Sequence, residues 1–245
     1  MSGHSKWSTI KRKKGANDQQ RAKIFTKIAR EIIVAVKAGG PDPNNNSSLK
    51  DVIAKARANN MPNDNINRTI KKAAGSGDGD NYESITYEGY GPAGVAVIVE
   101  TLTDNRNRTA ADVRAAFSKY GGNMGQSGCV SFMFDRKGVI VIEDEDGNID
   151  EDEITMDALE AGAEDISVED GIIEITTDPD DMGSVRENLE GKYTISSAEV
   201  SMIPQTTTDL TDEEQIKNMQ RLLDKLEDND DVQDVYHSWN MPDEE

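Results

Sequence analysis

The chemistry that this sequence offers first is the binding of a polyanion, because cations and an indole ring are concentrated at its start. The run His4, Ser5, Lys6 and Trp7 is followed by four cations: Lys11, Arg12, Lys13 and Lys14. Lysine and arginine neutralise phosphates and release counterions, and an indole can stack on an unpaired base. We therefore predict that these eight residues contact nucleic acid. For Trp7 a second interpretation remains open, as an anchor that packs on the first helix.

A second cationic stretch lies between a predicted strand and a predicted helix. The run Asp104–Thr109 contains Arg106 and Arg108. Two arginines beside the N-terminus of a helix can hold a phosphate, because their charge adds to that of the free backbone N–H groups. They could equally cap the helix or brace a domain interface. We include both arginines among the predicted binding residues and leave the structural role open.

Motifs of catalytic and metal sites are incomplete. The pattern Gly89–Gly94 matches G-x-G-x-x-G, but a predicted strand follows it, whereas a pyrophosphate site needs a helix there. The acidic run Asp144–Glu153 resembles a calcium loop, but Ile142 would occupy the first ligand position. The segment Gly125–Cys129 lacks the last glycine of a nucleophile elbow. We expect no enzymatic activity, no metal, no cofactor and no small-molecule substrate.

Composition indicates a soluble, cytoplasmic protein. The 245 residues include one cysteine, which fits a reducing compartment, and two histidines that lie at opposite ends of the chain. These three residues cannot form a zinc site. No run approaches the roughly 18 consecutive apolar residues of a membrane helix, and no apolar run follows the basic N-terminus as in a signal peptide. We therefore expect no membrane partner.

Charge is divided unequally along the chain. The net charge is −20, yet residues 1–75 contain 16 Lys and Arg against 5 Asp and Glu, a net charge of +11. Residues 76–245 carry the compensating −31. A polyanion is attracted to the first part and repelled by the second. The sequence thus predicts a polarised molecule that docks nucleic acid at its N-terminal end.

The N-terminal part predicts a domain of three helices. Apolar residues at helical spacing indicate an amphipathic helix over residues 20–37, and we predict nucleic-acid contacts for three cations on its opposite face: Lys23, Lys27 and Arg30. Further helices are expected to end at Ala58, with Ser47 or Ser48 as the cap, and to span residues 64–74. No helix-turn-helix with a basic second helix is evident, because the strongest cationic stripe lies on the first helix.

After a linker at residues 75–80, the pattern changes to strands and helices. Strands are predicted at 82–90, 94–102, 129–134, 138–142, 165–169, 171–176, 196–203 and 232–239. Helices are predicted to open at Thr109 and Thr211 and to span 153–162 and 182–190. The order within 135–207 is the β-α-β-β-α-β of a ferredoxin-like unit.

We therefore predict an α+β, multidomain chain in which an N-terminal three-helix domain is followed by two ferredoxin-like α/β lobes. The helical domain takes residues 1–80. One lobe is discontinuous, because the C-terminal helix and strand are needed to complete it, and takes 81–134 plus 208–245. The other lobe, 135–207, is inserted into it.

Five short segments together resemble the YebC/PmpR family: Gly3–Trp7, Lys23–Lys27, Tyr87–Gly91, Thr103–Thr109 and Gly121–Asn123. The resemblance extends over essentially the whole chain, although the acidic run at 143–153 looks like a variable hairpin. It implies three domains, a helical head with two α/β lobes, and no enzymatic activity.

The resemblance implies two different functions. Bacterial members are described as probable transcriptional regulators that bind promoter DNA. The mitochondrial member is a translational activator of a cytochrome oxidase subunit, and some bacterial relatives are linked to ribosomes that stall on proline-rich sequences. Physical arguments favour ribosomal RNA as the partner, because a body of net charge −31 is poorly placed along duplex DNA, whereas basic tails commonly fold on RNA. Promoter DNA is the alternative, and a protein-interaction scaffold that docks through its acidic lobes is a third possibility.

Overall fold

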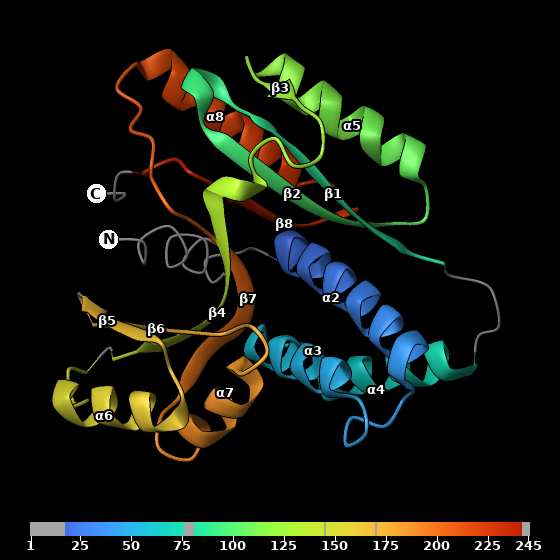
Figure 1. Ribbon diagram of the computed structural model, residues 1–245. Helices are drawn as coiled ribbons and strands as arrows, with labels where there is room; N and C mark the ends of the chain where they lie inside the picture. The colour runs from blue at the N-terminus through green and yellow to red at the C-terminus, as the bar shows by residue number, and fades with distance from the viewer. Residues whose placement is uncertain (1–17, 76–80, 145, 170, 242–245) are drawn as a thin grey trace.

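The computed structural model describes residues 18–75, 81–144, 146–169 and 171–241. Within these ranges the chain forms a helical head and two lobes, each built on an antiparallel four-stranded sheet (Figure 1). The expected α+β class, with an N-terminal helical region followed by two sheet-containing lobes, is confirmed. No helix in these ranges is long and apolar enough to cross a membrane.

The head consists of three packed helices, α2 (Asp18–Gly39), α3 (Ser47–Ala58) and α4 (Asn63–Gly75). The apolar stripe of α2 buries Ile28 and Ile32 against Leu49 of α3 and Ile66 of α4. This packing follows from the period of the α2 stripe, which brings one face of the helix to both partners.

The start of α3 differs from the sequence prediction. Asn46, not Ser47 or Ser48, is the N-cap, and its side-chain oxygen accepts a hydrogen bond of 3.0 Å from the Leu49 N–H. The amide nitrogen of the same side chain donates to two carbonyl oxygens of the preceding segment, those of Ala35 and Gly40, at 2.8 Å each. Asn46 is the N-cap because its amide group makes all three hydrogen bonds, whereas the single hydroxyl of a serine could not.

The second lobe is assembled from two separate stretches of chain. Its first elements are β1 (Glu83–Tyr90), β2 (Ala96–Thr103), α5 (Arg106–Lys119) and β3 (Asn123–Met124). Its last are α8 (Glu213–Glu227) and β8 (Val232–His237). The sheet order is β3-β1-β2-β8, so the C-terminal strand pairs with β2. This pairing supports the predicted discontinuous division of the chain, which remains a prediction in its exact boundaries.

Strand β2 is buried on both faces, which explains its nearly continuous apolar sequence. Val97 and Val99 belong to the core that α5 and α8 close, with Phe117 and Leu222. Ile98, on the other face, belongs to a smaller cluster with the segment that leads to the third lobe.

The third lobe has interleaved strand connections. Its elements are β4 (Phe134–Glu143), α6 (Glu151–Ala161), β5 (Asp165–Glu169), β6 (Ile172–Thr177), α7 (Met182–Glu190) and β7 (Ile195–Pro204). The sheet order β5-β6-β4-β7 places β6 between β4 and β5, and β4 between β6 and β7. Both crossovers, β4-α6-β5 and β6-α7-β7, therefore enclose a strand of the other, as in a split β-α-β ferredoxin-like unit.

The predicted strand at 129–134 is wrong. Most of this stretch is a loop with a short 3-10 turn, η2 (Ser131–Met133), and β4 begins at Phe134 and runs unbroken to Glu143. The physical reason is a long-range one. The carboxylate of Glu88 accepts hydrogen bonds from the N–H groups of Gly128, Val130 and Ser131, so these donors are not available to a strand ladder.

Two predicted helix starts are also corrected. Asn105 caps α5 by accepting from the Arg108 N–H at 3.1 Å, and Thr109 lies inside the helix. Asp212, rather than Thr211, caps α8 by accepting from the Gln215 N–H at 2.9 Å. In both cases the N-cap is an Asn or Asp, which are preferred over Thr at this position, and it lies within four residues of the predicted threonine.

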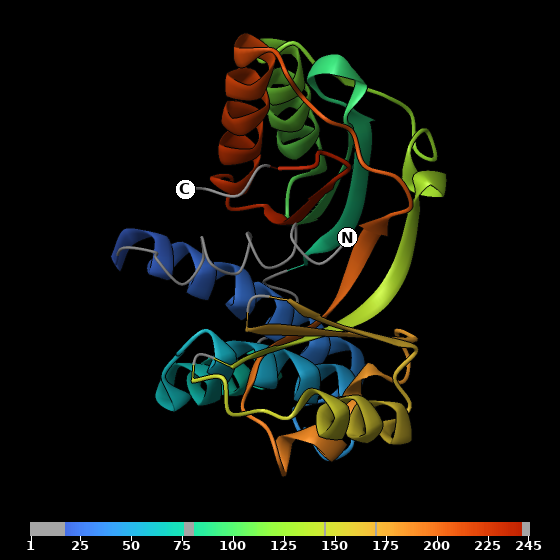
Figure 2. The same cartoon turned by 90° about the vertical axis from the view of Figure 1, so that its left-hand side faces the viewer.

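The head contacts both lobes. α3 packs along β7 of the third lobe, and α2 meets the connection between α8 and β8 of the second lobe. The long strands β4 and β7 run from one lobe to the other, and the head lies to one side of them (Figure 2). This arrangement decides which cations of the head remain at the surface.

Candidate nucleic-acid interface

The predicted contacts nearest the N-terminus lie outside the described residues. They are His4, Ser5, Lys6, Trp7, Lys11, Arg12, Lys13 and Lys14. For these eight side chains, contact with nucleic acid remains a prediction from the sequence.

The cations of α2 are engaged by the second lobe. Lys23 forms an ion pair with Asp228, and the Lys27 ammonium donates a 2.7 Å hydrogen bond to the carbonyl oxygen of Glu227. The polar face of α2, on which the sequence predicted nucleic-acid contacts, is thus turned toward the end of α8. A phosphate could reach these two lysines only by competing with those contacts.

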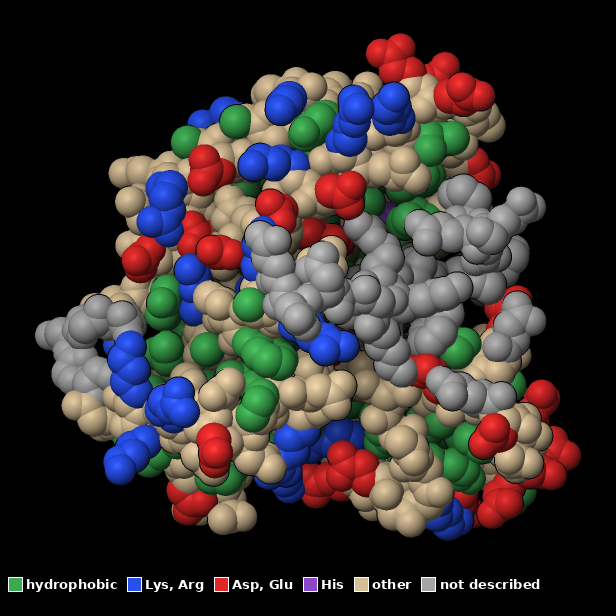
Figure 3. All heavy atoms as spheres, turned by 180° about the vertical axis from the view of Figure 1, so that it is seen from behind, with side chains coloured by type: hydrophobic (Ala, Val, Ile, Leu, Met, Phe, Trp, Pro, Cys, Tyr) green, Lys and Arg blue, Asp and Glu red, His purple; other side chains and the backbone are tan. Residues whose placement is uncertain are grey.

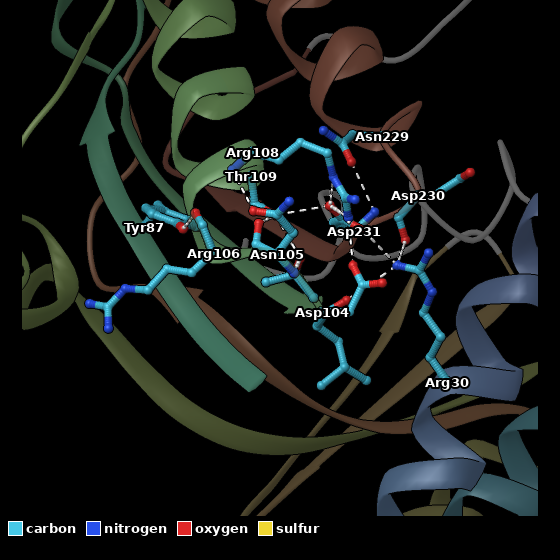
Figure 4. Close-up of polar contacts among 12 residues, drawn as sticks. Arg30, Tyr87, Asp104, Asn105, Arg106, Arg108, Thr109, Asn229, Asp230 and Asp231 are labelled. Atoms are coloured by element: carbon cyan, nitrogen blue, oxygen red, sulfur yellow. Dashed lines mark hydrogen bonds and ion pairs between the residues drawn. The ribbon is translucent and has the colours of Figure 1, made fainter. Parts of the chain in front are cut away.

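Arg30, Arg108 and Thr109 converge on one buried carboxylate, that of Asp231 (Figure 4). Asp231 is 3% exposed. Its Oδ1 lies 2.8 Å from a guanidinium nitrogen of Arg30, and its Oδ2 accepts from Arg108 at 2.7 and 3.2 Å. The hydroxyl of Thr109 donates to the same Oδ2 at 2.8 Å. The head and both segments of the second lobe thus meet at Asp231.

Electrostatics favour the charged form of Asp231. Burial alone would raise the pKa of its carboxyl, but hydrogen bonds from Arg108, Arg30 and Thr109 outweigh burial and hold the pKa below its ordinary value. Arg30 is further fixed by donating to the carbonyl oxygens of Leu102 and of a residue beside Asp231. Arg108 thus joins the two segments of the second lobe at Asp231, the carboxylate that Arg30 of the head also contacts.

Arg106 behaves differently from its neighbour. Its backbone carbonyl accepts from the Tyr87 hydroxyl at 3.4 Å, while its guanidinium points away from the Asp231 cluster (Figure 4). Arg106 is exposed, so it is available to a phosphate. Of the two arginines near the start of α5, the first is thus exposed and turned outward, whereas the second contacts Asp231.

A buried lysine joins three parts of the molecule, and sequence reasoning missed it. The ammonium of Lys55 (α3) lies 2.9 Å from Glu31 (α2), 3.7 Å from Glu199 (β7) and 3.8 Å from Asp234 (β8). Burial alone would lower the pKa of Lys55, but the three carboxylates outweigh it and raise the pKa well above its ordinary value. No local signal could reveal this cluster, because its acidic members are 24 to 179 positions away in the sequence.

A cavity of about 630 Å³ adjoins this lysine between the head and the two lobes. Both signs of charge line it, including Lys23 and Lys55 from the head and Glu174 and Asp224 from the lobes. Because the cations in its wall are balanced by acids, the cavity does not form a positive funnel for a polyanion.

Exposed cations form groups of three on α4, α5 and α8: Arg68, Lys71 and Lys72; Arg106, Arg114 and Lys119; and Lys217, Arg221 and Lys225. The helices α2 and α3 add Arg21, Lys37, Lys50 and Arg57. Figure 3 shows basic side chains beside the end of α4 and across the helices of the second lobe, while acidic side chains gather over the far end of the third lobe. The α4 group was missed from the sequence, although its spacing of three and four residues is a readable signal for one helix face.

The matches to known families cover nearly the whole chain. Residues 5–76 match the model of the TACO1/YebC protein N-terminal domain, and residues 82–239 match that of the TACO1/YebC second and third domain. A protein of Ruminiclostridium cellulolyticum named "probable transcriptional regulatory protein" is 64% identical, covering 100% of this chain and 98% of the relative. A relative of the same name from Acetivibrio thermocellus is 62% identical, covering 98% and 99%.

A solved structure has the same fold. The crystal structure of a conserved hypothetical protein from Aquifex aeolicus superposes with a TM-score of 0.83 at 45% sequence identity, and the match covers 93% of each chain.

Proposed function

Because this chain belongs to the TACO1/YebC family, as the resemblance to YebC/PmpR proteins indicated, we propose that it regulates gene expression by binding nucleic acid and catalyses no reaction. The relatives' printed names support a regulatory role. The proposal places the protein in the cytoplasm, where transcripts, ribosomes and promoters meet.

The observation that carries this proposal is the separation of charge between the head and the third lobe. Residues 1–75 carry +11, whereas residues 135–207 contain 4 Lys and Arg against 22 Asp and Glu, a net charge of −18. In the structure, the acids of the third lobe gather at one end of the molecule (Figure 3). A polyanion is therefore held at the head and excluded from the opposite end.

The finer form of the proposal names ribosomal RNA as the partner, with a role in translation such as relief of stalling on proline-rich sequences. Its support is the distribution of the cations. α2 turns Lys23 and Lys27 toward the end of α8, so we assign the phosphate contacts mainly to the basic N-terminal segment and to exposed cations such as those on α4. Separated basic patches suit a folded RNA, whose backbone offers phosphates in several directions, better than the regular surface of a straight duplex.

Promoter DNA remains a second candidate, and one observation favours it. α3 and α4 are joined by a short turn at residues 59–62, and α4 presents Arg68, Lys71 and Lys72 outward. A helix pair with an exposed basic second helix resembles a helix-turn-helix, which lays its second helix in the major groove. From the sequence, no such pair was expected, because the strongest cationic stripe lies on α2.

Sequence preference separates the two candidates. A labelled fragment of ribosomal RNA, bound to the full chain, is challenged with a promoter duplex and with the same duplex scrambled. If RNA is the partner, both duplexes compete equally and weakly, because they offer the same phosphates. A promoter that displaces the label at concentrations about 10³-fold lower than its scrambled copy would instead establish promoter-specific DNA binding.

A further inference from the structure

The loop between β3 and β4 is held in a fixed shape by one buried carboxylate. Glu88 of β1 is 6% exposed, and its carboxylate accepts three backbone hydrogen bonds, from Gly128 at 2.7 Å, Val130 at 2.9 Å and Ser131 at 2.8 Å. Burial alone would raise the pKa of this carboxyl, but the backbone donors outweigh burial and hold the pKa below its ordinary value. Glu88 thus acts as a charged anchor for the loop.

Further contacts fix the same loop. The Tyr90 hydroxyl donates to the carbonyl oxygen of Cys129 at 3.1 Å, and the Gly125 N–H donates to the carbonyl oxygen of Glu88 at 2.8 Å. Gly128 has φ of +87°, a conformation that favours glycine. So many constraints on a surface loop indicate that its shape matters, although it contains none of the catalytic patterns considered above.

The result of this arrangement is an exposed aromatic ring. Val130 and Phe134 are buried and Met133 is partly buried in the cluster beneath the loop, whereas Phe132 between them is 70% exposed. This exposure is the largest for any large hydrophobic side chain in the part of the chain that the structure describes. The short turn η2, which contains Phe132, lies at the outer edge of the molecule, where β4 begins (Figure 2).

The surroundings of Phe132 fit a flat, single-ring partner. A stable protein interface needs roughly 800 Å² on each partner. Only three other large hydrophobic side chains are exposed within the described ranges, and two of these, Met156 and Leu159, lie on α6 of the third lobe. The third, Tyr90, is 37% exposed, and its hydroxyl forms a hydrogen bond with the loop that carries Phe132. Two aromatic rings without a wider apolar patch suit stacking on a nucleobase, which needs one ring face.

We infer that Phe132 is a stacking platform for an unpaired nucleobase and that Glu88 is the positioning residue that holds the ring outward. This inference rests on the proposed function, because it assumes that the chain binds nucleic acid. The Phe132 side chain is 70% exposed and lies far in sequence from the basic N-terminal segment. It would add a contact with a base to the contacts with phosphates that the cations make. Holding the ring in place before binding lowers the entropy lost when the base arrives.

The test compares two probes that share phosphates and differ in bases. Fluorescence anisotropy of a labelled oligouridine and of an abasic oligonucleotide of equal length measures binding by the full chain. Phe132→Ala should weaken binding of oligouridine about tenfold and leave the abasic probe unchanged. Phe132→Trp should restore oligouridine binding. Met156→Ala, which also removes an exposed side chain (62%), is the matched control and should change neither probe.

A second variant tests the anchor. Glu88→Gln keeps the size of the side chain but weakens its bonds to the loop, so it should reduce oligouridine binding without changing abasic binding. Circular dichroism melting should show Phe132→Ala as stable as wild type, because its ring is exposed.

The remaining outcomes separate the inference from the proposed function. If Phe132→Ala binds both probes like wild type, while alanine at Lys11, Arg12, Lys13 and Lys14 weakens both, then the stacking inference is wrong and Phe132 is left to a protein partner. Equal weakening of both probes by Phe132→Ala would also overturn stacking. If wild type binds neither these probes nor the ribosomal RNA fragment, the proposed function fails and the inference fails with it.

Discussion

At the scale of single residues, Asp231 shows that two of the cations predicted to bind nucleic acid hold parts of the protein together. Its carboxylate is buried and satisfied by Arg30, Arg108 and Thr109. A phosphate that drew either arginine away would leave this carboxylate without a partner while it remained buried, which is costly. Arg106, whose guanidinium points outward, carries no such cost.

The first prediction concerns the loss of this charge. Asp231→Asn keeps the shape of the side chain but leaves two arginines without their shared carboxylate. We expect the free energy of unfolding to fall by about 3 kcal/mol, near the lower end for breaking a buried pair because Arg108 is half exposed. Urea denaturation at neutral pH measures it. Asp230→Asn is the control, since Arg30 contacts only the carbonyl oxygen of Asp230, and it should change stability by less than about 0.5 kcal/mol.

The stability difference between wild type and Asp231→Asn should also depend on pH. The pKa of Asp231 is lowered in the folded protein from an ordinary value of 3.8. Its contribution to stability is therefore complete above that value and disappears as the pH falls through the lower, folded pKa. The difference between wild type and Asp231→Asn should shrink as the pH falls below about 3.8. A difference that stays constant down to the acid unfolding limit would contradict the assigned ion pairs.

At the scale of elements, the third lobe depends on the close approach of α7 to its sheet. Gly138 in β4 leaves no room for a side chain, because a Cβ there would meet the hydroxyl oxygen of Thr177 and lie 2.6 Å from Cβ of Met182. Both neighbours are buried, so neither can move aside without disturbing the core. The glycine thus sets the distance between helix and sheet.

A further prediction follows from this contact. Gly138→Ala should lower the free energy of unfolding by about 2 kcal/mol, the cost of overpacking a core. Gly191→Ala is the matched control, because Gly191 has φ of −71° and no atom within 4 Å of the added Cβ. It should be neutral or stabilising by about 0.5 kcal/mol. Thermal unfolding of both variants measures the difference, and equal stability of the two would refute the proposed close packing.

Elements set by local periodicity could be predicted from the sequence, and those set by distant partners could not. The helices of the head and the β-α-β-β-α-β order of the third lobe follow from apolar spacing and turn residues. The strand predicted at 129–134 failed because its backbone donors are taken by Glu88, about 40 positions earlier. The cap of α3 failed for a related reason, since Asn46 reaches back to the end of α2.

The candidate interface was harder to predict than the fold. A stripe of cations on a helix looks the same in sequence whether it faces a phosphate or another part of the chain. Lys23 and Lys27 face the end of α8, whereas Arg68 and Lys71 of α4 are exposed. The exposed ring of Phe132 was hidden for a further reason, because it lies in an apolar run that is typical of a strand.

At the scale of the whole molecule, the three units are joined by buried charge and separated by surface charge. Lys55 holds acids from the head and from both lobes together. At the surface, the head is basic and the third lobe is acidic. The molecule is therefore one body with a fixed polarity, and we expect it to bind a polyanion at the head and to keep the third lobe away from it.

Sedimentation with purified ribosomes tests this central claim most directly. The full chain is centrifuged through sucrose at low and at moderate salt, beside a variant with alanine at Lys11, Arg12, Lys13 and Lys14. The control replaces three exposed or partly exposed cations of the third lobe with alanine: Arg136, Lys137 and Lys192.

We predict that wild type and control migrate with ribosomes at low salt and dissociate as salt rises. The N-terminal variant should bind more weakly, and the slope of its log affinity against log salt should be flatter by up to about 3. Wild type that stays at the top of the gradient at low salt, or an N-terminal variant that migrates like wild type, would contradict the account.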